Sequence, residues 1–212
     1  MSNIFRLSSL LTDNPMIWEL SRLFLDKAFG LYSKRIQLIR NKSFYKNSLS
    51  VLDIGCGTGQ YSTITQGQYL GLDINNRYIK YAGKRHRNHN QSFKCADVTV
   101  ITKELPKFDM VLMTDFLHHI PSQQCINLLN VCTNLVNQYV INFEPVTEQY
   151  NPIGRWVNKN DRGKYIRSLD ELHQIYKESQ LELIESLPLM IGPISTCAII
   201  SRPTILDKTK LI

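Results

Sequence analysis

Residues 51–60 read VLDIGCGTGQ, an apolar strand pattern followed by a glycine at every second position. Glycine lets the backbone turn sharply and approach a ligand closely, so such a turn after a strand is typical of a ligand site. The dinucleotide fingerprint G-x-G-x-x-G would need its third glycine where Gln60 stands. Asp53, two residues before the turn, would also repel a pyrophosphate. The turn therefore favours a ligand with a positive charge and no phosphate. A dinucleotide site, or a packing turn with no ligand, is the weaker alternative.

The composition is that of a single globular domain. The chain has 212 residues, 43% hydrophobic and 20% charged, with a net charge of +7. This length allows one sizeable core, and no apolar run approaches the length of a membrane span. The cysteines form no CxxC pair, so we expect reduced, mostly buried thiols, no metal site and a cytoplasmic location. The cysteines are Cys56, Cys95, Cys125, Cys132 and Cys197.

The first part of the chain has a helical pattern. Asn14 can cap a helix, Pro15 suits its first position, and apolar residues recur at helical spacing in two segments that break at Gly30. We therefore expect residues 1–48 to form a helical N-terminal extension.

From residue 49 to residue 145, short apolar runs alternate with helical patterns, which predicts a parallel sheet covered on both faces. Helices fit at 75–87 and 121–136, and the short stretch after Gly59 leaves room for only a short helix. The expected strands of this core are 50–54, 68–73, 92–96, 108–113 and 138–143.

After Pro145 the alternation stops. Residues 146–167 are expected to be irregular, and a capping box of Ser168 and Glu171 begins a helix in the C-terminal region, residues 168–212. The β-type runs at 180–187 and 195–201 predict an antiparallel pair. The predicted fold is one α/β domain with a Rossmann-like, doubly wound sheet that is mostly parallel.

The segments DIGCGTG, YLGLDIN and CADVT follow the first three expected strands in order. With them, the chain resembles the class I S-adenosylmethionine-dependent methyltransferases over most of residues 50–145. This resemblance implies seven strands in the order 3-2-1-4-5-7-6. It also implies that the turn residues Gly55, Cys56 and Gly57 bind the methionine part of S-adenosylmethionine, and that Asp53 orients its amino end.

The same resemblance implies the other cofactor contacts. Asp73 would accept both ribose hydroxyls and Asp97 the adenine amino group, while Ile74 and Val98 pack on the two faces of the adenine ring. Three acids at three successive strand ends are hard to explain as solvated strand ends.

The stretch MTDFLHHIPSQQ follows the fourth expected strand. It resembles the LHH segment of small-molecule methyltransferases related to those of ubiquinone and menaquinone biosynthesis. Thr114 and Asp115 would touch the cofactor. His119 is our preferred general base and His118 the second candidate, although a histidine that caps or packs the next helix is equally compatible with the pattern.

Residues 146–167 are expected to form a lid over an acidic or phosphorylated acceptor, because cations and aromatic residues interleave there. A solvated basic loop is the alternative. The expected acceptor contacts are Glu144, Arg155, Trp156, Tyr165 and Arg167.

Taken together, these patterns predict methyl transfer to a small metabolic or natural-product acceptor by direct displacement. Cyclisation or elimination on the same fold, or binding without catalysis, is the alternative. Protein or RNA methylation is less favoured, and nucleic acid is an unlikely partner because TDFL stands where many base-amino methyltransferases have a (D/N)PP(Y/F)-type motif. The sequence gives no oligomeric state.

Overall fold

The computed structural model describes residues 14–98 and 105–204, which fold as two compact units. The first unit contains the described residues up to 98 together with 190–194, and the second contains 105–189 together with 195–204. The parts of the expected N-terminal extension and C-terminal region at 1–13 and 205–212 lie outside the described residues. The expected boundaries at residues 48, 145 and 167 stay predictions.

The sheet has seven strands in the order β3-β2-β1-β4-β5-β7-β6. Strands β1, β2 and β3 are parallel, β4 and β5 are parallel, and β7 runs antiparallel to β5. The predicted fold class, a mostly parallel sheet completed by an antiparallel C-terminal pair, is therefore confirmed. The strands are β1 (Val51–Ile54), β2 (Tyr69–Asp73), β3 (Gln91–Cys95), β4 (Phe108–Thr114), β5 (Val136–Pro145), β6 (Leu181–Ile191) and β7 (Ile194–Pro203).

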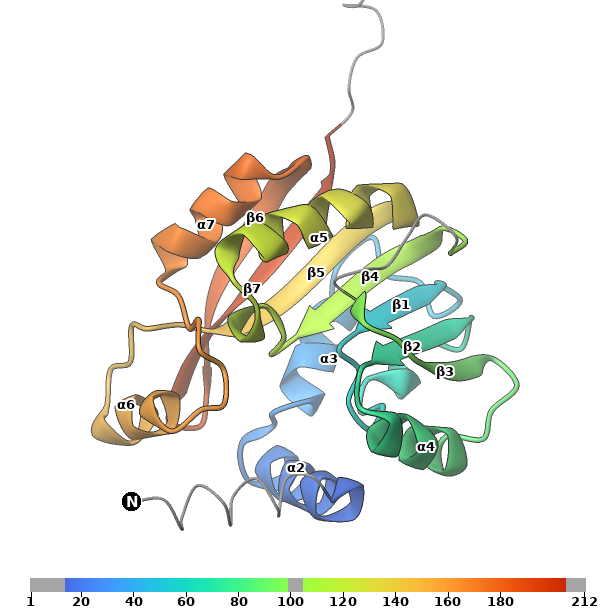
Figure 1. Ribbon diagram of the computed structural model, residues 1–212, viewed down its shortest axis with the longest axis horizontal. Coiled ribbons are helices and arrows are strands. Elements are labelled where there is room, and N and C mark those ends of the chain that lie inside the picture. Colours follow the sequence, from blue (N-terminus) through green and yellow to red (C-terminus); the bar gives the residue numbers. More distant parts are fainter. Residues whose placement is uncertain (1–13, 99–104, 205–212) are drawn as a thin grey trace, which may run out of the picture. The chain divides into compact units, whose positions relative to one another are not determined.

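In the first unit, helix α4 (Asn76–Arg85) packs against β2, β3 and helix α2 (Pro15–Phe29) (Figure 1). Helix α2 begins where Asn14 Oδ1 accepts from the Met16 N–H at 2.9 Å, and it ends at Gly30, whose φ of 74° suits glycine. Helix α3 (Ser33–Arg40) follows. The 3₁₀ helix η1 (Ser62–Ile64) after β1 is as short as expected.

The apolar stripe of α2 does not form the core of this unit. Ile17, Leu20 and Phe24 are 39%, 60% and 68% exposed, whereas Glu19 is only 4% exposed. The periodicity therefore predicted the helix correctly but not the face that it buries.

In the second unit, helices α5 (Ser122–Leu135) and α7 (Leu169–Glu178) pack side by side over the strands (Figure 1). The predicted capping box at the start of α7 is confirmed, since the Glu171 N–H donates to Ser168 Oγ and the Ser168 N–H to Glu171 Oε2. Across the described ranges, no helix has both the length and the apolar character needed to cross a membrane. All five cysteines are free, and four of them are buried.

The segment that we expected to be irregular contains helix α6 (Pro152–Lys159). Asn151 caps it by accepting from the Gly154 N–H at 2.8 Å, and Pro152 takes the first helical position. The expectation that residues 146–167 are irregular is therefore wrong for residues 152–159. A proline preceded by an asparagine cap is instead a helix start, and this explains the error.

Candidate functional site

The glycine turn of the first unit has the backbone geometry that its sequence predicts. Gly55, Gly57 and Gly59 have φ values of 75°, 56° and 82°, a region that other residues rarely adopt. A Cβ atom on Gly59 would lie 2.7 Å from the Phe93 ring. The three glycines therefore meet a conformational requirement of the turn, and at Gly59 a packing requirement as well.

Asp73, at the end of β2, is bonded directly to this turn. Its Oδ2 accepts from the Gly57 N–H at 2.9 Å and its Oδ1 from the Asn75 N–H at 2.7 Å. Because β2 and β3 are parallel, with Asp73 opposite Cys95, Asp97 follows at the same edge. The structure thus brings the glycine turn, Asp73 and Asp97 to one edge of this unit.

The apolar positions at this edge differ in exposure. Ile74 is 69% exposed directly after β2, while Val98 is 6% exposed and Cys56 is 4% exposed. A branched aliphatic side chain held in water at a strand end offers an apolar surface to a flat ligand. Ile74 fits the expected adenine contact well, and Val98 less well.

Asp53 lies inside the unit. It is 0% exposed, and its Oδ2 accepts from the Tyr69 hydroxyl at 2.5 Å. Burial, together with the charge of Asp73, raises the pKa of Asp53 to about 7 in spite of the Tyr69 hydrogen bond. Among the described residues, Asp53 Oδ1 has no hydrogen-bond partner. Asp53 is therefore partly protonated at neutral pH, and a ligand ammonium near Oδ1 would favour its ionised form.

Glu19 is a residue of this region that the sequence analysis missed. It accepts from Thr58 Oγ1 at 2.6 Å and Gln60 Nε2 at 2.9 Å, and it pairs with Arg85 Nε at 3.1 Å. Through these bonds the buried carboxylate joins α2 to the glycine turn. In the sequence, Glu19 is an acid beside an apolar stripe. Such a pattern usually indicates an exposed side chain on a solvated helix face, so it does not predict this buried contact.

In the second unit, strand β4 ends in a strained turn. Asp115 has a φ of 51°, the one positive φ of a non-glycine residue in the described ranges, and its N–H donates to Phe143 O at 2.8 Å. Backbone strain of this kind is concentrated at functional sites. The turn continues as the 3₁₀ helix η3 (Leu117–His119), which contains both candidate histidines.

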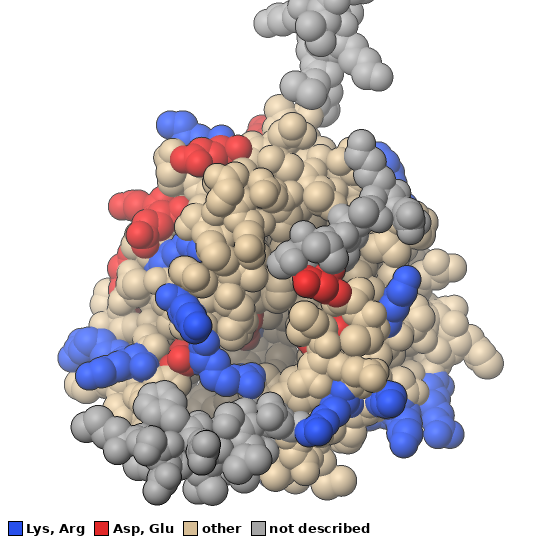
Figure 2. Space-filling view, viewed as in Figure 1, with Lys and Arg blue, Asp and Glu red and all other residues tan. Residues whose placement is uncertain are grey.

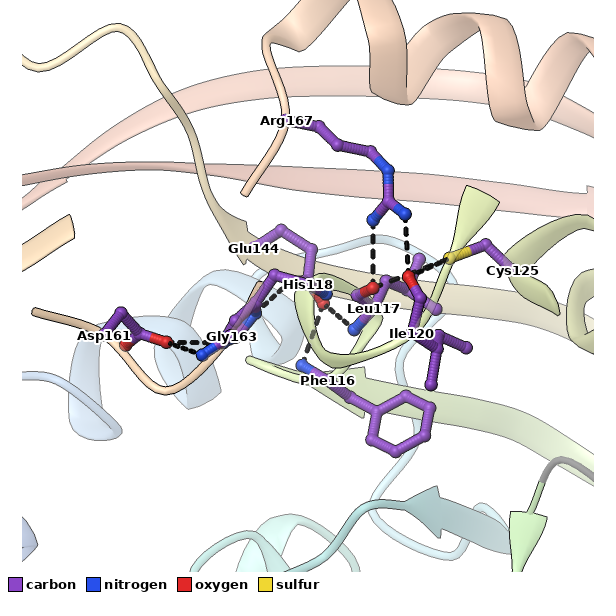
Figure 3. Close-up of polar contacts among 9 residues, drawn as sticks. All are labelled: Phe116, Leu117, His118, Ile120, Cys125, Glu144, Asp161, Gly163 and Arg167. Carbon is purple, nitrogen blue, oxygen red and sulfur yellow. Dashed lines mark hydrogen bonds and ion pairs between the residues drawn. The ribbon is translucent and has the colours of Figure 1, made fainter. Parts of the chain in front are cut away.

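Glu144, near the end of β5, organises this turn (Figure 3). Its Oε1 accepts from the N–H groups of Phe116 and Leu117 at 2.9 and 2.7 Å. Its Oε2 accepts from the His118 N–H at 3.2 Å and meets His118 Nδ1 at 2.6 Å. Glu144 is 1% exposed and fully engaged within the protein, so the expectation that it contacts the acceptor is corrected.

His118 lies between two carboxylates. Its Nε2 is 3.3 Å from Asp161 Oδ1, opposite the contact with Glu144 (Figure 3). Burial alone would lower the pKa of His118, but the charges and hydrogen bonds of Glu144 and Asp161 outweigh it and raise the pKa to about 10. His118 is therefore a cation at neutral pH and is unsuited to be a general base.

His119 has the opposite character. Its ring centroid is 4.2 Å from that of His118. Desolvation and the positive charge of His118 lower the pKa of His119, which keeps its ring neutral at physiological pH. Of the two histidines, only His119 is in the protonation state that a base requires.

Arg167 is also engaged within the protein. It is 5% exposed and donates to Leu117 O at 2.9 Å, Ile120 O at 2.7 Å and Ser122 Oγ at 3.2 Å. These bonds fix the end of η3 and the start of α5. The expectation that Arg167 binds the acceptor is corrected for the same reason as that for Glu144.

The remaining expected acceptor residues reach the surface. Trp156 is 66% and Tyr165 39% exposed, and the exposed Arg155 donates to Gln149 O at 3.3 Å. Lys and Arg side chains lie on the side of the view where α6 and the following loop lie and also on the side of α4, while Asp and Glu side chains lie near α7 (Figure 2). In the second unit the exposed cations of α6 and the following loop are Arg155, Lys159, Arg162 and Lys164. This basic surface with exposed aromatic rings is the part of the second unit best suited to an anionic small molecule.

Gly163→Ala is expected to disturb the histidine cluster. A Cβ atom at this position would lie 1.9 Å from His118 Cδ2 and 2.9 Å from His118 O. Because His118 is held by two carboxylates, the loop has to move, at a cost of about 1–3 kcal/mol in the free energy of unfolding. Urea denaturation measures this loss.

Gly83→Ala is the matched control. Nothing lies within 4 Å of a Cβ atom at this position on α4, so the substitution should stabilise the protein by up to about 1 kcal/mol. Equal unfolding midpoints for Gly163→Ala and the wild type would contradict the close packing of Gly163 on His118.

Comparisons with known proteins show the family to which the chain belongs. The model of the family described as "Methyltransferase domain" matches residues 45–184. Ubiquinone biosynthesis O-methyltransferases from strains of Coxiella burnetii are 29% identical over 92 residues, which make up 41% of this chain and 38% of theirs. The matched stretch is thus well under half the length of these relatives.

Two solved structures share the fold at low sequence identity. Magnesium protoporphyrin IX methyltransferase from Synechocystis PCC 6803, with bound S-adenosylmethionine, has a TM-score of 0.60 at 15% identity, over 79% of this chain and 76% of that chain. The cyclase SpnF has a TM-score of 0.64 at 14% identity, over 80% of this chain and 80% of that chain. The family model covers more than half of the residues, and the chain therefore belongs to the class I S-adenosylmethionine-dependent methyltransferases.

Proposed function

We propose that the protein transfers a methyl group from S-adenosylmethionine to a small-molecule acceptor by direct displacement. The observation that carries the proposal is the turn of three glycines with positive φ, bonded through the Gly57 N–H to Asp73 at the neighbouring strand end. This arrangement fits a ligand with a ribose diol and a nearby cationic amino acid part. When bound, S-adenosylmethionine supplies an electrophilic methyl group on a sulfonium.

The first unit holds the nucleoside and methionine parts in this proposal. Asp73 accepts the ribose hydroxyls, Asp97 takes the adenine amino group, and the exposed Ile74 covers one face of the adenine. Val98 is assigned to the other face. Gly55, Cys56 and Gly57 line the methionine part, with Asp53 behind them.

The second unit handles the acceptor. Thr114 and Asp115, at the strained end of β4, are assigned to the cofactor, and His119 accepts the acceptor's proton. Because methyl transfer from a sulfonium needs alignment and exclusion of water above all, a base matters only if the nucleophile carries a proton to be removed. A hydroxyl is such a nucleophile. The neutral His119 and the name of the Coxiella relatives both support O-methylation.

Arg155, Trp156 and Tyr165 are assigned to the acceptor's anionic and apolar parts. The exposed cations of α6 and the loop that follows support an acidic or phosphorylated molecule. In the structure the segment is held by bonds such as that from Asn158 Nδ2 to Val146 O at 2.7 Å. A role as a lid therefore requires it to open when the acceptor enters. The five cysteines are free, and for this reason a cytoplasmic location is part of the proposal.

The second candidate function is cyclisation or elimination with the cofactor bound but not consumed. The fold is similar to that of the cyclase SpnF, and this similarity supports the second candidate. Cofactor binding without any catalysis is a further alternative.

The test is an incubation with methyl-labelled S-adenosylmethionine and a metabolite extract, followed by separation of small molecules, protein and RNA. Label in the small-molecule fraction together with an equal amount of S-adenosylhomocysteine supports the proposal. Label in protein or RNA alone would move the acceptor to that class. Cofactor binding without release of S-adenosylhomocysteine, from extracts of several sources, would favour the second candidate.

A further inference from the structure

We infer that His118 is a positioning residue: clamped between Glu144 and Asp161, it pins the loop at residues 161–165 to the turn that carries His119 and lies as a fixed positive charge beside the His119 ring. The inference rests on the proposed function for the role of His119 as a base. It gives the buried His118 a role that does not require contact with the acceptor.

The loop at residues 161–165 contacts both the ring and the main chain of His118. Asp161 Oδ1 meets the ring at Nε2 and also accepts from the Gly163 N–H at 2.6 Å. The Tyr165 N–H donates to the main-chain oxygen of His118 at 3.0 Å. Gly163 lies so close to the ring that no side chain fits between them. His118 thus holds the loop at Asp161, as Figure 3 shows, and also at Tyr165 through its main-chain oxygen.

The charge of His118 follows from its partners. Both ring nitrogens face carboxylate oxygens, and only a doubly protonated imidazole can donate to both. The side chain is 5% exposed, so water screens this charge little. The raised pKa of about 10 agrees with the geometry.

His118 also acts on the His119 ring through its charge. The charged groups that act on its ring are His118 on the same turn, Glu144 on β5, and Asp161 and Arg162 on the loop after α6. The cations His118 and Arg162 lower the pKa of His119, and the two carboxylates raise it. Removing His118 or Asp161 should therefore move the pKa of His119 in opposite directions.

The experiment compares His118→Asn with Asp161→Asn. In His118→Asn the amide can still donate to Glu144 while the charge and the contact with Asp161 are lost. NMR titration of the histidine rings, with His119 assigned by its own substitution, gives its pKa in each protein. We expect an increase of about one unit in His118→Asn and a decrease in Asp161→Asn. We also expect faster hydrogen exchange at the N–H groups of Gly163 and Tyr165 in both variants.

The result that would overturn the inference is an unchanged pKa of His119 in both variants, or a shift in the same direction. If only one variant folds, the sign of its shift decides. The pH profile of kcat/KM separates this inference from the proposed function. If the pKa of the His119 ring moves as expected and the acid limb of the kcat/KM profile moves with it, the positioning role of His118 and the base role of His119 are both supported. If the ring pKa moves and the acid limb does not, the positioning role of His118 stands and the base role of His119 fails.

Discussion

Glu144→Ala is expected to lower the free energy of unfolding by about 3–5 kcal/mol, because it leaves a buried cation without its closest partner. The carboxylate accepts from three main-chain N–H groups and from His118 Nδ1, and Glu144 is 1% exposed. Urea denaturation with tryptophan fluorescence measures the loss. Glu182→Ala is the control, since Glu182 pairs with Arg202 at the surface, where both side chains are nearly half exposed, and should keep wild-type stability. Similar midpoints for the two variants would contradict the structural role of Glu144.

The same cluster predicts a pH dependence of stability. The pKa of His118 is raised from 6.5 to about 10 in the folded protein. Its contribution to stability is therefore fully present below pH 6.5 and is lost as the pH rises through about 10. The wild type should lose more stability between pH 6 and pH 10 than His118→Asn does, and denaturation midpoints at the two pH values test this.

Asp73→Ala is expected to weaken the binding of S-adenosylhomocysteine by at least about a hundredfold. Charge-assisted hydrogen bonds are worth about 1.5–3 kcal/mol each, and the proposed ribose contact contains two. The substitution also removes the acceptor of the Gly57 and Asn75 N–H groups, so the turn itself loses support. Isothermal titration calorimetry gives the change in Kd.

Asp97→Ala is the matched control for this prediction. It lies at the same edge but is exposed, and the proposed adenine contact is a single bond, so a loss of about tenfold is expected. Equal affinities of the wild type and Asp73→Ala would remove Asp73 from the site. A larger loss in Asp97→Ala would reverse the assigned ranking.

The parts of the fold that could be predicted are those fixed by local chemistry. The turn after β1, the cap at Asn14 and the capping box of Ser168 and Glu171 each depend on residues a few positions apart. The alternation of strands and helices likewise needs only local periodicity. Helix α6 shows that local patterns can be ambiguous. Pro152 begins a helix if Asn151 caps it and interrupts a helix if Asn151 does not.

The bonds within the candidate site were less predictable because their partners are distant in sequence. Glu144 binds the turn at 116–118, and Glu19 binds the turn residues Thr58 and Gln60. The sequence indicated that an acid and two histidines follow neighbouring strands, but not which of them neutralise one another. The exposed apolar stripe of α2 was unpredictable for a related reason, since periodicity finds a helix without showing what it packs against.

The most direct test of the central claim, that the glycine turn and Asp73 form an S-adenosylmethionine site, is a calorimetric titration of the wild-type protein. S-adenosylhomocysteine and NAD are titrated separately under the same conditions. Saturable binding of S-adenosylhomocysteine near one molecule per chain, without comparable binding of NAD, is the predicted result. Absence of binding at millimolar S-adenosylhomocysteine, or tighter binding of NAD, would contradict the account.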